Sequence, residues 1–206
     1  MAIKYMTSIG DPKQLDTLLR DQALDGKIEK RVVFAGRSNA GKSSLLNSMT
    51  RSKIAQISRE PGKTRKVNLF FCDYHKKVFV DLPGYGFAKR TGNERKLWEQ
   101  LISSYLEADK ENIDRIILVT DCRHGPSDSD LHAMEFFHSL GFSVTLVLSK
   151  SDKLNQKKTS ARRKEIKEIL SDIKPEKSYW ISSLKGTGVR ELSKDIIHAG
   201  TESNIS

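Results

Sequence analysis

Cysteine, metal-binding histidine spacings and long apolar runs are scarce or missing in this 206-residue sequence. Its two cysteines, Cys72 and Cys122, lie far apart and form no C-x-x-C pair. This argues against a disulfide framework and a zinc site, and favours buried free thiols in a reducing compartment. No two histidines have a metal-binding spacing, so we expect ordinary loop or helix residues at His75, His124, His132, His138 and His198.

The apolar runs are too short to cross a bilayer. The longest, such as the run at 116–119, are much shorter than the roughly 20 residues that a membrane-spanning helix needs. The first residues, 1–5, also lack the apolar core of a secretion signal. We therefore expect a cytoplasmic monomer that does not bind a membrane.

Basic residues outnumber acidic ones, 36 to 26, which gives a net charge of +10. This excess indicates a polyanionic partner, most simply RNA and less readily an anionic membrane, although it can also serve solubility alone. Two runs of basic residues hold much of this charge. The first can bind RNA; the second can equally be a helix face that is merely solvated. They consist of Arg51, Lys53, Arg59, Lys63, Arg65 and Lys66, and of Lys157, Lys158, Arg162, Arg163, Lys164 and Lys167.

From Lys30 onward the pattern alternates between strands and helices. We expect a mostly parallel, six-stranded α/β sheet with helices on both faces, and a hairpin at 73–76 that supplies one antiparallel edge strand. A polar lead and a helix from Asp11-Pro12 would form an extension at 1–27, before a single domain at 28–198 and a frayed tail at 199–206. The strands are expected at 31–36, 67–72, 77–81, 113–121, 142–148 and 177–182, and the helices at 42–50, 94–108, 126–140 and 155–172, with a last one carrying Val189, Leu192 and Ile196.

The segment from Gly36 to Ser43 reads G-x-x-x-x-G-K-S, between an apolar strand pattern and a helical one. Glycines let such a loop wrap tightly, so that its N–H groups and the helix N-terminus point at phosphate oxygens. Lys42 can reach the β- and γ-phosphates, and the Ser43 hydroxyl can ligate Mg²⁺. A chance glycine-rich turn before a helix is the alternative.

Three further motifs follow expected strands, and a lone hydroxyl, Thr64, lies in the basic loop. Asp81-Leu82-Pro83-Gly84 can hold Mg²⁺ through a water and sense a γ-phosphate through the Gly84 N–H. In Ser149-Lys150-Ser151-Asp152, the carboxylate can accept hydrogen bonds from guanine, which adenine does not offer in that arrangement. In Ser182-Ser183-Leu184-Lys185, the Leu184 N–H can donate to guanine O6.

Together these motifs resemble, in order, the five G motifs of Ras-like P-loop GTPases, and within the Era-like class they resemble the EngB (YihA/YsxC) ribosome-biogenesis GTP-binding proteins. The segments that carry the resemblance are 36–44, 61–64, 81–86 and 182–185, and it spans nearly the whole chain. It implies nucleotide contacts from Gly36, Arg37, Ser38, Asn39, Ala40, Gly41, Lys42, Ser43 and Ser44, from Gly62, Lys63 and Thr64, from Asp81, Leu82, Pro83 and Gly84, from Ser149, Lys150, Ser151 and Asp152, and from Ser182, Ser183, Leu184 and Lys185.

The same resemblance implies a GTPase that switches between GTP and GDP states. Its partners would be ribosomal RNA and precursors of the large ribosomal subunit, with a link to septation and cell division. Mg²⁺ would be held by Ser43, Thr64 and Asp81, and the catalytic residues would be Lys42, Thr64, Gly84 and Asn39.

Two positions depart from the family pattern, and one residue has two interpretations. Ser149 replaces the usual Asn or Thr; it keeps a hydroxyl but lacks a carboxamide that would tie its motif to the phosphate loop, so we expect an effect on nucleotide affinity and none on base choice. Tyr85 follows the third motif where Ras proteins have a catalytic glutamine, so we expect slow intrinsic hydrolysis. Asn39 can help to bind K⁺, as its counterpart does in related GTPases, or it can simply suit a turn.

Two other functions remain open from the residues alone. A P-loop kinase would leave Asp81–Gly84 and Ser149–Asp152 unexplained. A nucleotide-independent RNA-binding module would use the loop only to grip backbone phosphate. Titration with GDP distinguishes a GTPase, which binds it, from the RNA-binding module. Release of phosphate without an acceptor distinguishes a GTPase from a kinase.

Overall fold

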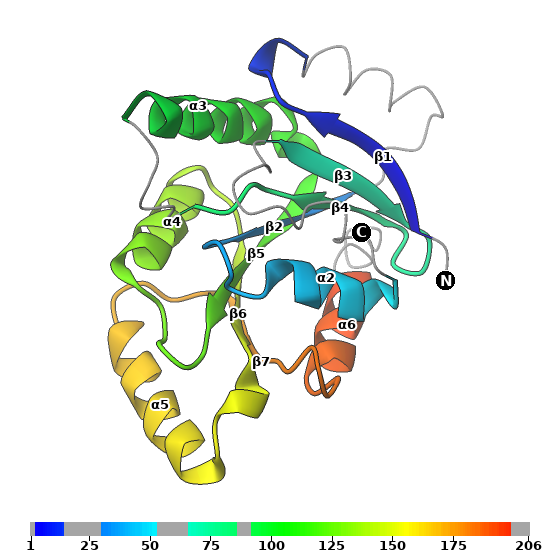
Figure 1. Ribbon diagram of the computed structural model, residues 1–206. Helices are drawn as coiled ribbons and strands as arrows, with labels where there is room; N and C mark the ends of the chain where they lie inside the picture. The colour runs from blue at the N-terminus through cyan, green and yellow to red at the C-terminus, as the bar shows by residue number, and fades with distance from the viewer. Residues whose placement is uncertain (1–2, 15–29, 53–65, 86–91, 199–206) are drawn as a thin grey trace, which may run out of the picture.

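The computed structural model describes residues 3–14, 30–52, 66–85 and 92–198, which build one seven-stranded sheet with helices on both faces (Figure 1). Along the sheet the strands follow the order β1-β3-β4-β2-β5-β6-β7. Their bounds are β1 Ile3–Ile9, β2 Arg31–Gly36, β3 Val67–Cys72, β4 Lys77–Asp81, β5 Ile113–Asp121, β6 Val144–Ser149 and β7 Lys177–Trp180. The α/β class is therefore confirmed.

Parallel pairing joins β4, β2, β5, β6 and β7, and the antiparallel pairings are confined to the β1–β3–β4 side. The expected antiparallel edge is thus confirmed, but the sheet has seven strands rather than six. The extra strand is β1, where we expected a polar lead; it pairs with β3 from Ile3 opposite Cys72 to Ile9 opposite Val67. Pro12–Gln14 forms a short 3₁₀ helix, and the rest of the helix expected there lies outside the described residues.

The helices cover the sheet in two groups (Figure 1): α3, α4 and α5 on one face, α2 and α6 on the other. Successive side chains of a strand point to opposite faces, so Val33 and Ala35 of β2 join the first core while Val32 and Phe34 join the second. The bounds are α2 Lys42–Thr50, α3 Gly92–Ala108, α4 Asp128–Ser139, α5 Gln156–Ile169 and α6 Val189–His198. No helix in these described segments is long and apolar enough to cross a membrane.

The β3–β4 hairpin turns at Asp73–Lys76, as expected, but its histidine is not an ordinary loop residue. His75 is 2% exposed, and its ring packs 5.0 Å from that of Phe79. Its Nδ1 lies 3.0 Å from the Cys72 Sγ. Burial lowers the pKa of His75 to about 4 and raises that of the Cys72 thiol. Both cysteines are buried and free, as predicted.

The buried imidazole should make stability depend on pH. Its pKa is about 4 when folded against an ordinary 6.5, so the unfolded chain takes up the proton first as pH falls. Stability should then be lost from pH 6.5 down to about 4, by up to about 1.4 kcal/mol per pH unit. We expect His75→Phe to reduce the loss measured by urea unfolding between pH 7 and pH 5.

His138→Gln, a change at an exposed histidine on α4, is the control and should follow wild type at both pH values. An equal loss in His75→Phe and wild type would mean that other groups cause the acid sensitivity.

Candidate functional site

The phosphate-loop sequence forms the connection between β2 and α2. Gly36 has a φ of 153°, and a Cβ there would lie 2.4 Å from the Val119 carbonyl oxygen. Gly41, with a φ of 104°, caps α2, and Asn39 has a left-handed φ of 65°. The loop thus needs glycine at both ends and an asparagine-tolerant position between them. It has the strand–loop–helix context that a phosphate site requires.

Lys42 and Asp81 form an ion pair under this loop, between the start of α2 and the end of β4. Their side chains are 11% and 4% exposed, so the cation of one loop already lies against the carboxylate of the other. Ser43 follows in the first turn of α2, and its hydroxyl hydrogen-bonds to no described residue. A carboxylate and a hydroxyl are the oxygen donors that Mg²⁺ takes, so the residues present fit that ion.

The loop after β4 packs directly on the phosphate loop. The Ser38 N–H donates to the Tyr85 carbonyl at 3.0 Å. A Cβ at Gly84 would lie 2.9 Å from the Ser38 Oγ and 3.0 Å from its backbone nitrogen, so the contact requires glycine. The two loops therefore form one backbone surface.

The Tyr85 side chain binds a buried carboxylate that no sequence motif includes. Its hydroxyl donates to Asp130 Oδ1 at 2.7 Å, and the Ser127 N–H and hydroxyl donate to Oδ2 at 2.9 and 2.7 Å. Thr120, near the end of β5, lies 3.3 Å from the same oxygen. Burial, reinforced by Asp130, raises the pKa of Tyr85 far above its usual value. The ring is thereby fixed to α4.

The fourth motif is tied to the phosphate loop despite its unusual first residue. The Ser149 hydroxyl donates to the Ala40 carbonyl. The hydroxyl that Ser149 keeps thus makes a link in place of the missing carboxamide, because β6 ends close enough for a short side chain to reach. A Cβ at Gly41 would lie 3.1 Å from the same hydroxyl oxygen, so the loop and strand are in contact.

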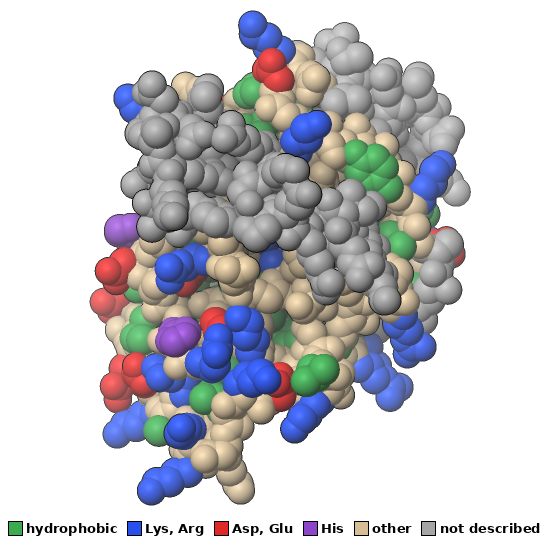
Figure 2. Space-filling model, viewed as in Figure 1, with side chains coloured by type: hydrophobic (Ala, Val, Ile, Leu, Met, Phe, Trp, Pro, Cys, Tyr) green, Lys and Arg blue, Asp and Glu red, His purple; other side chains and the backbone are tan. Residues whose placement is uncertain are grey.

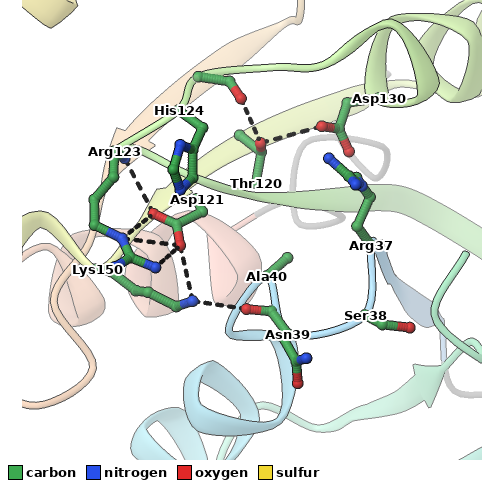
Figure 3. A pocket seen from close by; sticks show the side chains of 11 residues that line it. Arg37, Ser38, Asn39, Ala40, Thr120, Asp121, Arg123, His124, Asp130 and Lys150 are labelled. Atoms are coloured by element: carbon green, nitrogen blue, oxygen red, sulfur yellow. Dashed lines mark hydrogen bonds and ion pairs between the residues drawn. The ribbon is translucent and has the colours of Figure 1, made fainter. Parts of the chain in front are cut away.

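Lys150 follows in a left-handed conformation, with a φ of 58°. Its Nζ donates to the Asn39 carbonyl at 2.7 Å and to Asp121 Oδ2 at 2.8 Å (Figure 3). Arg123 also binds Asp121, with Nη2 at 2.7 Å from Oδ2. Partial burial works against ionisation of Asp121, but the bonds from Arg123 and Lys150 outweigh it and hold its pKa well below the usual range. These residues line one side of a cavity of about 220 Å³ beside the phosphate loop.

Asp152 and Ser182 bring the fourth and fifth motifs together. The Ser182 hydroxyl donates to Asp152 Oδ1 at 2.7 Å, which lowers the pKa of this carboxyl. The Ser151 N–H also donates to the Ile181 carbonyl at 3.1 Å. Leu184 beyond them is 78% exposed. The carboxylate is thus ionised and held at the end of β6, with one oxygen engaged by the protein.

The loops that carry the predicted motifs therefore meet at the carboxyl ends of β2, β4, β6 and β7. Gly62, Lys63 and Thr64 lie outside the described residues. Three residues of this region were not anticipated, namely Asp121, Arg123 and Asp130. A signal for the first existed, because Asp121 is a charged residue that closes a strand with an apolar run at 116–119.

Basic side chains surround part of this region. Figure 2 shows Lys and Arg gathered over the part of the viewed face where α5 and the loop between β5 and α4 lie. Backbone donors, a lysine, oxygen ligands for a cation and an ionised carboxylate thus share one end of the sheet. Together they can bind a phosphate-bearing ligand with a hydrogen-bonding base.

Comparison with known proteins agrees with this chemistry. A family model described as 50S ribosome-binding GTPase matches residues 31–150. The chain is similar to probable GTP-binding proteins EngB, with 42% identity in Clostridium beijerinckii over 82% of this chain and 84% of that protein, and 39% in Thermotoga maritima over 80% and 84%. A crystal structure of a probable GTP-binding protein engB superposes with a TM-score of 0.63 at 26% identity, over 81% of this chain and 98% of that one. Era in complex with MgGDPNP and a 16S ribosomal RNA segment gives 0.64 at 25%, over 82% and 56%.

The bond from Tyr85 to Asp130 predicts a measurable cost when the hydroxyl is removed. Tyr85→Phe leaves a buried carboxylate short of one donor, and hydrogen bonds to charged groups are worth about 2 kcal/mol. We expect a loss of unfolding free energy of about that size in urea denaturation. Tyr5→Phe removes a hydroxyl from an exposed bond to Ser8 and should cost far less. Similar small losses in both variants would show that the bond to Asp130 is not important for stability.

Proposed function

Since this chain belongs to the EngB family of GTP-binding proteins, within the 50S ribosome-binding GTPases, we propose that this GTPase is a molecular switch in assembly of the large ribosomal subunit. The observation that carries the proposal is the convergence of the phosphate loop with the loops after β4, β6 and β7. Neither a kinase nor a nucleotide-independent RNA-binding module accounts for that convergence. Membership of a GTPase family also argues against both of these functions.

We propose that the phosphates lie in the loop from Gly36 to Ser44. Lys42 would then exchange its contact with Asp81 for the β- and γ-phosphates, because a doubly ionised phosphate competes well for an ammonium group. Ser43, Asp81 and, in the GTP state, Thr64 would hold Mg²⁺, which neutralises charge on the phosphates when bound. The Gly84 N–H would donate a hydrogen bond to the γ-phosphate, so the presence of this phosphate would affect the whole loop, which packs on Ser38.

The guanine base would lie between the Lys150 stem and the loop that contains Leu184. Asp152 would accept from N1–H and the 2-amino group, with Ser182 holding the carboxylate in place. The Leu184 N–H would donate to O6. Selection follows because an adenine would leave the partners of the guanine edge without hydrogen bonds.

Intrinsic hydrolysis should be slow. The Tyr85 hydroxyl is committed to Asp130 at 2.7 Å, so it is not available to orient an attacking water as the glutamine of Ras does. The left-handed backbone of Asn39 supports its interpretation as a turn residue. A K⁺ site there remains a prediction, because the first-switch carbonyls that would complete it belong to residues 53–65, outside the described part of the chain.

Ribosomal RNA is the partner that the surface supports. On α5, the exposed cations are free to meet phosphate, apart from Arg163, which lies 4.9 Å over the Trp180 ring; they are Lys157, Lys158, Lys164 and Lys167. Of the first basic run, only Arg51 and Lys66 are described, and both are exposed. Each contact with phosphate would add a salt-dependent term to affinity. The similar protein Era has been crystallised with ribosomal RNA. A cytoplasmic monomer fits this role.

The base assignment predicts a change of nucleotide preference. Asp152→Asn should weaken GTP binding and favour xanthosine triphosphate, because the amide can donate to its 2-oxo group. Affinities of wild type and variant for both nucleotides, measured by competition with a fluorescent nucleotide, test this. If the variant keeps the wild-type preference for GTP, Asp152 does not contact the base.

The switch itself predicts nucleotide-dependent binding to ribosomal particles. We expect the protein to sediment with large-subunit precursors in the presence of a non-hydrolysable GTP analogue and to remain in the supernatant with GDP. Asp152→Asn is the matched control, since its sedimentation should follow xanthosine nucleotides instead. Equal sedimentation in both nucleotide states would argue against a switch, while sedimentation in neither would argue against the ribosomal partner.

A further inference from the structure

We propose that Asp121 is a positioning residue for guanine nucleotides: it fixes Lys150, through an ion pair, in the orientation in which the lysine stem packs on the base. The inference rests on the proposed guanine site. Asp121 lies outside the GTPase motifs, at the end of β5. In this proposal it does not touch the nucleotide and acts on it through Lys150.

The first observation is the position of the Lys150 ammonium. It is shared between the carbonyl of Asn39, in the phosphate loop, and the carboxylate of Asp121, at 2.7 and 2.8 Å. The lysine therefore joins the loops that follow β2, β5 and β6. With its two ends held, by the left-handed backbone and by these acceptors, the stem between them has few conformations left.

The second observation is that Asp121 is itself held. Arg123 binds both carboxylate oxygens, with Nε 3.0 Å from Oδ1 and Nη2 2.7 Å from Oδ2, and its backbone N–H donates to Oδ1 at 3.0 Å. The Asp121 side chain is 13% exposed, whereas that of Lys150 is 30% exposed. A carboxylate held by both the backbone and the side chain of Arg123 is a rigid anchor for the more exposed lysine (Figure 3).

Removal of the Asp121 carboxylate should speed the release of nucleotide. Without Asp121, the ammonium would keep one neutral acceptor and could swing toward solvent, so the stem would cover the base for less of the time. The base is common to GTP and GDP, so both should be released faster. Discrimination between the two depends on the γ-phosphate region and should not change.

The test is the dissociation rate of fluorescent GDP and of a fluorescent non-hydrolysable GTP analogue. A lost hydrogen bond to a charged group corresponds to about a tenfold to hundredfold change in rate, and we expect Asp121→Ala to release both nucleotides faster within this range. Asp121→Asn keeps an acceptor but no charge, so its rates should lie between those of wild type and alanine.

Asp114→Ala is the matched control. Asp114 lies at the other end of β5, is 16% exposed and pairs with Lys77 and Arg115, so its removal also costs a half-buried ion pair. Asp114→Ala and Asp121→Ala should both lower the urea midpoint, but only the second should speed release. Faster release in both would mean that Asp121 acts through general stability, and would overturn the proposal.

A double variant tests the route through the lysine. Lys150→Met keeps the stem and removes the ammonium; in that background Asp121→Ala should change release less than twofold. A full effect there, or wild-type release in Asp121→Ala alone, would overturn the inference while leaving the proposed function intact. If wild type binds neither nucleotide, the proposed function fails first, so the two failures are distinguishable.

Discussion

The rest of the site depends on the absence of a side chain at Gly36. A Cβ at this position would lie 2.4 Å from the Val119 carbonyl oxygen, so any other residue would push β2 away from β5. Because the two strands stay in contact, the phosphate loop begins directly beside the end of β5. The loop backbone can then reach the ends of β4 and β6 as well, through Ser38 and Ala40.

These loops hold one another by polar contacts between strand ends. Backbone carbonyls of the phosphate loop accept from Ser149 and Lys150, while Asp81 binds Lys42. Directional bonds of this kind fix geometry more strictly than apolar packing, and they place each donor and acceptor before a ligand arrives. Preorganisation lowers the cost of ordering on binding, which favours binding of the nucleotide.

Local sequence predicted the central elements well, because their patterns are strong and their neighbours agree with them. The ends of β3, β4 and α2 match the expected ranges, and glycine or turn residues flank each of them. β1 was missed because only one of its residues, Ile9, is fully buried; its strand state is decided by the free edge of β3, which no local pattern reveals.

The candidate site also has features that local sequence predicts and features that depend on neighbouring strands. The place of the motif loops at one end of the sheet was predictable because phosphate chemistry demands particular residue types at fixed spacing, as at Lys42 and Ser43. The contacts of Asp121 and Asp130 were not, since they depend on which strands are neighbours and on where Lys150 and Tyr85 point. The link from Ser149 to Ala40 could not be predicted for the same reason, because the reach of a hydroxyl depends on a distance between two strand ends.

β1 also has a consequence for the behaviour of the protein in concentrated solution. Its seven residues cover the outer backbone of β3 from Val67 to Cys72. An uncovered β3 would present a row of unpaired N–H and C=O groups from an apolar strand, which is a template for pairing with a second molecule. A segment that contributes little to the hydrophobic core therefore protects the chain against aggregation.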